Sequence, residues 1–443
     1  MSGERWEAVR QQAIAVLKLN DGGDWTRASP SLYPHQWSWD SACIAVGWAH
    51  IDPLRALREL ERLFDAQWST GMVPHIVFDP EVGEDAYFPG PGQWESSLSP
   101  AAPHVATSGI CQPPIHALAL RRVWELTPDH QRSEVLAGIR RLYPRMLAWH
   151  RYLADQRDPE RSGLVTVYHP WESTDNSPRW DSVLARIEVG DLAPFTRRDT
   201  LHVTDAAQRP TDLDYRRYLW LVELLKQRRY DDASVQREYP FLIKDVFFSA
   251  ILVAASSVLL ELADVVGAAR TDREQLAEWI RRGRDGISQR FEPDRALCFD
   301  YDLRADTPIR VRTFACFAPL VAETPDTVQQ AALLKRLNST DYCGEPRLRW
   351  PLLPSTSPAE SVFEPRNYWR GPTWPVVNWL LWRSLCRLGH VDRAEKLRQA
   401  ALAQLASSGL GEYFEPFTGE SLGSDSQSWT AALALDWIAA KRN

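Results

Sequence analysis

The stretch Tyr33-Pro-His-Gln-Trp-Ser-Trp-Asp40, continued by Ser41-Ala-Cys-Ile-Ala-Val-Gly-Trp-Ala49, predicts how the chain folds. Residues 41–49 are almost all apolar, which is typical of a helix buried on every side. Pro53 then begins a second helix, charged on one face, that runs to about Gln67. An aromatic loop is thus followed by a buried helix, and the buried helix by one that exposes a face to solvent.

This pairing recurs along the chain. Apolar residues 115–126 precede a long charged helix at about 130–156, and apolar residues 376–388 precede an amphipathic helix at 391–407. Further helices are predicted at 4–19, 215–227, 238–267, 271–290 and 427–441, with two more within 316–337. Buried helices that alternate with half-exposed ones are explained by two concentric rings. We therefore expect an all-α protein, an (α/α)6 barrel or toroid.

The long loops of this barrel are rich in proline, glycine and aromatic residues. We expect a single catalytic domain over residues 1–443, with capping insertions at about 69–104 and 183–212 at the active-site end. Loops that enter the inner helices should meet at that same end of the barrel.

Composition narrows the classes of function. The chain has 443 residues, 20 Trp against 3 Met, and a formal net charge of −7. The Trp excess favours stacking surfaces, and the negative charge argues against a nucleic-acid partner.

None of the six cysteines forms a C-x-x-C pair, so we expect buried free thiols. Residues 247–260 read as a buried helix rather than a membrane span, and the N-terminal residues lack a signal pattern. We expect a cytoplasmic protein.

The loop His169-Pro-Trp-Glu-Ser-Thr-Asp-Asn-Ser-Pro-Arg-Trp-Asp181 carries three carboxylates and two Trp. Aromatic rings cover the apolar face of a pyranose, and acids bind hydroxyls or move protons. The alternative is an irregular loop whose Trp side chains fill a gap in the core and whose Asp side chains cap helices.

A second acidic loop, Gly411-Glu412-Tyr-Phe-Glu415-Pro-Phe-Thr-Gly-Glu420, would approach the first when the barrel closes. A pair of carboxylates is the minimum for glycoside hydrolysis, in which one acid stays protonated and the other holds a water. Burial beside Trp171 and Trp180 would raise the pKa of an acid in the first loop. No H-E-x-x-H motif, phosphate-binding loop or G-x-S-x-G elbow competes with this interpretation.

Three motifs in order, Asp175-Asn-Ser-Pro-Arg-Trp-Asp181, Tyr368-Trp-Arg-Gly-Pro-Thr-Trp374 and Glu412-Tyr-Phe-Glu-Pro-Phe-Thr-Gly419, resemble glycoside hydrolase family 63. The short length and the Tyr33–Asp40 stretch, which leads into the first buried helix, most resemble the compact bacterial members of the family, the mannosylglycerate and glucosylglycerate hydrolases. The resemblance implies an (α/α)6 barrel, inversion and no cofactor, with Asp175 as general acid and Glu412 as general base.

One departure concerns Glu172. The family often shows Glu-Ser-Gly-x-Asp, whereas Glu172-Ser-Thr-Asp175 is one residue shorter, and we expect Glu172 to bind substrate. Glu415 and Glu420 are rivals for the base. Asp181 is expected to be structural, pairing with Arg179 or capping a helix.

The expected sugar subsite combines aromatic residues with one acid, and further polar residues lie near it. Its members are Trp37, Trp39, Asp40, Trp369 and Trp374, with Tyr33, His75, Tyr87, Gln112, Trp171 and Tyr215 beside them. For each Trp the alternative is packing inside the inner ring. A glycerate carboxylate requires an arginine, for which Arg209 is the first candidate, with Gln427 as neighbour; a solvated surface charge is the alternative for Arg209.

The sequence therefore predicts an inverting α-glycosidase for a small anionic glycoside, glucosylglycerate or mannosylglycerate. Its acid and base would lie about 6.5–9.5 Å apart. A trehalase-like or small-oligosaccharide α-glucosidase, a non-catalytic sugar-binding protein and, more remotely, an epimerase are the alternatives. We expect no metal, no cofactor and no membrane or nucleic-acid partner, and a homo-oligomer is compatible with the sequence.

Overall fold

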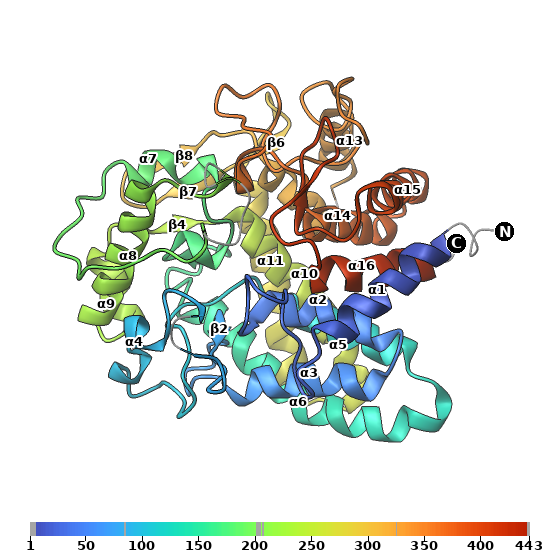
Figure 1. Cartoon of the computed structure of the whole chain (residues 1–443), viewed down its shortest axis with the longest axis horizontal. Helices are drawn as coiled ribbons and strands as arrows, with labels where there is room; N and C mark the ends of the chain where they lie inside the picture. The colour runs from blue at the N-terminus through green and yellow to red at the C-terminus, as the bar shows by residue number, and fades with distance from the viewer. Residues whose placement is uncertain (1–5, 84–85, 201–204, 206–207, 325, 441–443) are drawn as a thin grey trace.

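The structure is a computed structural model, and it describes residues 6–83, 86–200, 205, 208–324 and 326–440 (Figure 1). Most of the described chain is helical. The α-helices are α1 Glu7–Leu19, α2 Ser38–Ala49, α3 Pro53–Asp65, α4 Pro91–Trp94, α5 His116–Leu126, α6 Arg132–Asp155, α7 Asp181–Leu184, α8 Asp212–Gln227, α9 Asp232–Glu238, α10 Val246–Val266, α11 Arg270–Gln289, α12 Ala318–Val321, α13 Thr327–Leu337, α14 Pro375–Arg387, α15 Val391–Ser408 and α16 Ser428–Ala439.

Short strands punctuate the loops. They are β1 Gln36–Trp37, β2 Ile76–Val77, β3 Thr166–Val167, β4 Ile243–Lys244, β5 Phe291–Glu292, β6 Leu297–Cys298, β7 Asp300–Asp302, β8 Thr307–Ile309, β9 Tyr413–Phe414 and β10 Ser421–Leu422. β3, β4, β7 and β8 form one antiparallel four-stranded sheet. The chain is mostly helical, as predicted, and these strands were not predicted because strands of two or three residues are too short to show an alternating pattern.

Six helices pack in a closed circuit. α2 contacts α5, α5 contacts α10, α10 contacts α12, α12 contacts α14, α14 contacts α16, and α16 contacts α2. Every residue of α2 is buried, whereas α3, packed outside it, buries Leu57, Leu60 and Leu63 and leaves other positions to solvent. α6, α11 and α15 likewise pack against members of the circuit from outside. The predicted alternation of buried and half-exposed helices is confirmed for these pairs.

Asp436 in α16 joins four helices of the circuit. One of its carboxylate oxygens accepts hydrogen bonds from Arg122 in α5 (2.7 Å) and pairs with His50 after α2 (3.0 Å). The other accepts from the Trp379 indole in α14 (2.9 Å). In Figure 1 the last helix, α16, lies against α1 and α2, so the first and last described helices pack together.

Helix α10 is the longest apolar helix of the circuit. It is long and apolar enough to cross a membrane by length and composition, but 78% of its most apolar window is buried in the protein. It begins at Val246 and not at residue 238 as expected, because Asp245 caps it by accepting from the amides of Phe247 (2.8 Å) and Phe248 (2.9 Å). The burial confirms the prediction of a core helix.

All six cysteines are free thiols. Cys43, Cys111, Cys298, Cys316 and Cys343 are buried as expected, and Cys386 is exposed.

Candidate active site

The main pocket lies where loops lead into the helices of the circuit. Trp39 and Asp40 stand in the first turn of α2, Gln112 precedes α5, and Trp374 and Gln427 directly precede α14 and α16. Residues from both predicted capping segments cover the pocket, which has a volume of about 100 Å³. The loops that lead into these helices of the circuit therefore meet at this pocket.

The pocket gathers every residue predicted for the site except Glu172. Those that line it are Tyr33, Trp37, Trp39, Asp40, His75, Tyr87, Gln112, Trp171, Asp175, Arg209, Tyr215, Trp369, Trp374, Glu412 and Gln427. The fold thus brings together segments that are more than three hundred residues apart in sequence, such as Tyr33 and Glu412, whose side chains hydrogen bond at 2.7 Å.

Glu412 is buried and surrounded by donors. One carboxylate oxygen accepts from the hydroxyls of Tyr33 (2.7 Å) and Tyr368 (3.3 Å), and the other accepts from the Ser424 amide (3.3 Å). Arg209 places its guanidinium 3.6 Å from that second oxygen. Burial raises the pKa of Glu412, while Arg209 and the hydroxyl donors oppose the rise. These contacts favour the ionised form of a carboxyl that burial alone would protonate.

Asp175 lies between two short 3-10 turns, at the end of the aromatic loop. Burial, reinforced by the charge of Glu412 and opposed by Arg209, raises the pKa of Asp175 to about 7. The turn is held from both sides: the Trp180 indole donates to the Thr174 carbonyl (2.7 Å), and the Asn176 amide donates to the Tyr218 hydroxyl (3.1 Å). Asp175 can therefore carry a proton near neutral pH in a fixed position.

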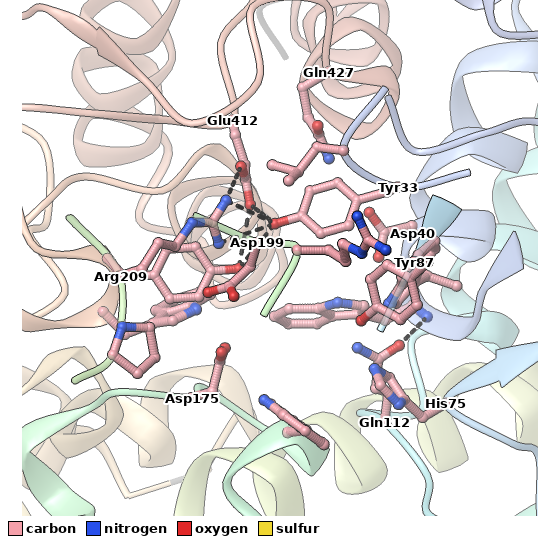
Figure 2. A pocket seen from close by; sticks show the side chains of 18 of the residues that line it. Tyr33, Asp40, His75, Tyr87, Gln112, Asp175, Asp199, Arg209, Glu412 and Gln427 are labelled. Carbon is pink, nitrogen blue, oxygen red and sulfur yellow. Dashed lines mark hydrogen bonds and ion pairs between the residues drawn. The ribbon is translucent and has the colours of Figure 1, made fainter. Parts of the chain in front are cut away.

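Figure 2 shows Glu412 and Asp175 entering the pocket from opposite sides. The rivals for the base do not line it. Glu415 is buried in the turn of its own loop, where it accepts from the Phe417 amide (3.0 Å), and Glu420 is exposed and pairs with Arg366 (2.6 Å). Of the three acids of this loop, the structure brings only Glu412 to Asp175.

Stacked tryptophans form one wall. The rings of Trp369 and Trp374 are parallel within 3° at a centroid distance of 3.8 Å, and Trp374 stacks further on Tyr413 (4.7 Å). Trp39 meets Trp429 edge to face (5.2 Å). The rings pack in the inner circuit and also line the pocket, so packing and sugar stacking are not exclusive for these residues.

Several buried polar atoms of the wall lack a hydrogen-bond partner within the described part of the chain. They are Gln427 Oε1, His75 Nδ1 and Arg209 Nε. Buried polar atoms are normally paired, so such atoms in a pocket are where hydroxyl or carboxylate groups of a ligand can bind. Burial also lowers the pKa of His75 to about 3, which leaves the ring neutral.

Asp40 is a third carboxyl in the pocket. Burial, followed by the charge of Glu412, raises the pKa of Asp40 to about 8. A protonated carboxyl can donate to one sugar hydroxyl and accept from another.

The position of Glu172 differs from the sequence-based expectation. It was expected to bind substrate, but it is fully buried outside the pocket and pairs with Arg157 at 2.6 Å. Its oxygens also accept from the amides of Tyr168 and Cys111. Burial disfavours ionisation, but Arg157 outweighs it and holds the pKa of Glu172 below its ordinary value. Glu172 therefore holds the 169–181 loop in place through contacts outside the pocket.

Arg209 is not a solvated surface charge. Its side chain is buried, its guanidinium lies 4.5 Å from the centre of the Tyr368 ring, and its Nη atoms donate to the Tyr33 hydroxyl at 3.3 Å. It lines the pocket beside Glu412, so the alternative considered from the sequence is wrong.

Asp181 is structural but with a different partner. It forms a two-pronged ion pair with Arg370 (2.8 Å for both bonds). Arg179 instead pairs with Asp300 (2.9 Å) and Asp245 (3.4 Å) and donates to Thr174 Oγ1 (2.8 Å). The partners come from distant elements, which spacing along the chain does not reveal.

Sequence reasoning missed Tyr368, Asp199 and Trp429, all of which line the pocket. Tyr368 stands first in a quoted aromatic motif, and that position was the available signal. Asp199 lies in a polar stretch without a motif, where it forms an ion pair with Arg197 (2.7 Å). Within the described residues, no group of three or more His, Cys, Asp or Glu side chains is placed to hold a metal ion.

Comparison with known proteins agrees with this geometry. Residues 33–430 match the model of the mannosylglycerate hydrolase MGH1-like glycoside hydrolase domain. The chain is 44% identical to the glucosylglycerate hydrolase of Mycolicibacterium hassiacum, over 96% of this chain and 97% of that protein. It is 43% identical to the mannosylglycerate hydrolase of Thermus thermophilus, over 96% and 99%.

A solved structure is equally similar. The crystal structure of the family 63 mannosylglycerate hydrolase from Thermus thermophilus in complex with Tris and D-glycerate matches with a TM-score of 0.89 at 42% identity. The match covers 97% of this chain and 99% of that one. The chain therefore belongs to the mannosylglycerate and glucosylglycerate hydrolases of glycoside hydrolase family 63.

Proposed function

We propose that this protein hydrolyses glucosylglycerate or mannosylglycerate to a hexose and glycerate. Full-length relatives that are 43–44% identical bear these two activities as their names, and a close structural relative was crystallised with D-glycerate. The observation that carries the proposal is the pair formed by Asp175, whose pKa is raised to about 7, and Glu412, which is surrounded by donors, in one enclosed pocket.

The proposed mechanism is a single displacement with inversion. Asp175 gives its proton to the glycosidic oxygen as the bond to the anomeric carbon breaks. Glu412 removes a proton from a water that attacks that carbon from the opposite face. Arg209, Tyr33 and Tyr368 keep Glu412 ionised and in place for this step. The products are a β-hexose and glycerate with a free hydroxyl. Proton exchange with solvent then returns Asp175 to its protonated form and Glu412 to its ionised form.

The pocket offers separate groups for the two halves of the substrate. Asp40 and Gln427, on opening turns of α2 and α16, are suited to hexose hydroxyls beside the Trp39 and Trp374 rings. Arg209 carries a buried positive charge and an unpaired Nε, which suits a glycerate carboxylate.

We also infer that the closed circuit of α2, α5, α10, α12, α14 and α16 is the inner ring of an (α/α)6 barrel. Helices α3, α6, α11 and α15, which pack on it from outside, support an outer ring. The capping segments 69–104 and 183–212 would then close the active-site end of one domain.

The test is to incubate the purified protein separately with glucosylglycerate, mannosylglycerate and trehalose and to measure hexose release. Cleavage of a glycerate glycoside with much higher kcat/KM than trehalose is expected. Cleavage of trehalose alone would assign the trehalase-like alternative, and binding of all three without turnover would assign a sugar-binding protein.

A further inference from the structure

A second cavity of about 360 Å³ lies between the two capping segments, beside the active-site pocket. Tyr87, Phe88 and Arg198 line both spaces. The remaining wall of this cavity, which we call the cap cavity, includes Gly92 and Phe195. The two spaces thus share a wall of three side chains, one of which is charged.

The shared wall lies on the side of the general acid. Phe88 stacks on Tyr215 (ring centroids 6.4 Å apart), and Tyr215 meets Trp171, in the loop that carries Asp175, edge to face at 5.9 Å. Tyr215, which also lines the active-site pocket, donates to the Phe88 carbonyl (3.0 Å) and so fixes this wall. In glycoside hydrolysis the leaving group contacts the general acid. The cap cavity is therefore a continuation of the aglycone side of the pocket.

The surface of the cap cavity suits a ring. Phe88 and Phe195 are parallel within 3° at 5.7 Å, and Tyr215 stacks on Phe195 at 6.0 Å. Aromatic surfaces of this kind bind the apolar face of a sugar or another aromatic ring. Arg198, at the junction, can hydrogen bond to hydroxyl or ether oxygens. Ligand pockets range from about 300 to 1,000 Å³, so the volume is sufficient for one ring.

We propose that the cap cavity is an additional subsite on the aglycone side, which binds a ring attached to glycerate, so that the enzyme also cleaves glycerate glycosides with an extended aglycone. The ring is a second sugar or an aromatic group. The reaction is unchanged: water adds to the anomeric carbon, and the extended glycerate leaves with the proton of Asp175. This inference rests on the proposed function.

The first experiment compares three substrates that share the same α-linked hexose. One carries glycerate, one glycerate with a benzyl ether on its 3-hydroxyl, and one glycerate with a glucosyl group on that hydroxyl. The wild-type protein is expected to cleave glycerate glycoside and at least one ring-bearing substrate, with kcat/KM values within about tenfold of each other. Cleavage of only the benzyl or only the glucosyl substrate identifies the kind of ring.

The second experiment fills the cap cavity. A Cβ on Gly92 would meet no atom within 4 Å, and its backbone is not left-handed, so Gly92→Phe adds a ring without strain. We expect this variant to raise KM for the ring-bearing substrates at least about tenfold and to leave the glycerate glycoside unaffected. Gly83→Phe is the matched control: Gly83 lies in the same capping segment, has equally open space and does not line the cavity.

The outcomes separate the two proposals. If the wild type cleaves the glycerate glycoside but neither ring-bearing substrate, the subsite is refuted and the proposed function stands. If Gly92→Phe slows all three substrates equally, the cavity is an entry path and the subsite is again refuted. If no glycerate glycoside of any kind is cleaved, the proposed function itself fails.

Discussion

Asp175 and Glu412 differ in their surroundings, and this difference supports the roles proposed for them. Glu412 accepts three hydrogen bonds and faces Arg209, all of which favour its charge. Asp175 lies in the pocket, where desolvation and the negative charge of Glu412 disfavour its own ionisation. When the environment of one carboxyl favours its protonated form and that of the other favours its ionised form, the pair can act as general acid and general base.

The first prediction concerns pH. The general acid must be protonated, so kcat/KM should fall as pH rises through the pKa of Asp175, about 7. The general base must be ionised, so activity should also fall at low pH, through a Glu412 pKa that burial raises above its ordinary value. A pH profile of kcat/KM on glucosylglycerate measures both limbs. Activity that stays constant up to pH 9 would contradict the assignment of Asp175 as acid.

The second prediction concerns substitution of the two acids. Asp175→Asn and Glu412→Gln should each lower kcat by a factor of about 10² to 10⁴, because each removes one proton transfer. Glu420→Gln, an exposed acid of the same loop, is the control and should retain wild-type turnover. The thermal midpoint of all three should match the wild type. Loss of activity in Glu420→Gln with retention in Glu412→Gln would reverse the choice of base.

Most residues of the site could be predicted from residue types and motifs, whereas the ion-pair partners of those residues could not. The Trp, Tyr and acidic residues that line the pocket stand in recognisable aromatic motifs before apolar helices. Glu172 belongs to the same motif as Asp175, yet its position depends on Arg157, a residue outside every motif. Asp199 lines the pocket because the backbone of its segment passes beside it, and no local sequence motif predicts that course.

At the scale of elements, the loop that carries the acid is fixed at several points. Arg157 pairs with Glu172 behind it, Arg179 ties it to Asp245 at the start of α10, and Asp181 ties it to Arg370. Asn176, next to the acid, donates to Asn367, which precedes Tyr368. Because Tyr368 donates to Glu412, the acid loop and the base are joined through one short segment.

The third prediction distinguishes anchoring from substrate binding at Glu172. Glu172→Ala leaves the buried Arg157 with Asp232 (3.2 Å) as its acidic partner, and loss of the buried pair with Glu172 should lower the free energy of unfolding by up to about 3–5 kcal/mol. Denaturant unfolding measures this change, and KM of the remaining folded enzyme gives the second readout. An unchanged unfolding midpoint together with a raised KM would restore the original expectation that Glu172 binds substrate.

Helix positions follow from the sequence because periodicity and caps are local. α5, α6, α11, α14 and α15 lie within about two residues of their expected limits. α10 begins eight residues later than expected, since residues 238–245 hold a strand and the Asp245 cap. The four-stranded sheet was not predicted, because each strand is very short and β3, β4 and β7 pair over long distances in sequence.

At the scale of the whole molecule, the circuit of helices closes between the first and last parts of the chain. Asp436 bonds with His50, Arg122 and Trp379, and so links α16 to the regions of α2, α5 and α14. Burial disfavours ionisation, but the hydrogen bond from His50 and the charge of Arg122 outweigh it and hold the pKa of Asp436 far below its ordinary value. The depressed pKa means that ionised Asp436 stabilises the folded state.

The fourth prediction is that Asp436→Ala lowers the free energy of unfolding by about 1–3 kcal/mol, because the Trp379 indole and His50 lose their acceptor, whereas Arg122 keeps Glu125 as a partner. For a group with a depressed folded pKa, the stabilisation is present above the unfolded value of about 3.9 and is lost as pH falls toward the folded value. The difference between wild type and Asp436→Ala should therefore shrink below about pH 4. Unfolding by denaturant at pH 7 and at pH 3 measures it.

Glu7→Ala is the control for this comparison. Glu7 pairs with Arg10 on the exposed face of α1, and its loss should leave the unfolding midpoint unchanged at pH 7. Equal midpoints for Asp436→Ala and Glu7→Ala would show that the buried contacts of Asp436 do not hold the circuit closed.

The most direct test of the central claim is the anomeric form of the first hexose released. Proton NMR during early hydrolysis of an α-linked glycerate glycoside resolves the two anomers before they equilibrate. Inversion by Asp175 and Glu412 predicts that the β-hexose appears first and the α-hexose grows in later by mutarotation. Initial release of the α-hexose would contradict the single displacement and, with it, the roles given to both carboxyls.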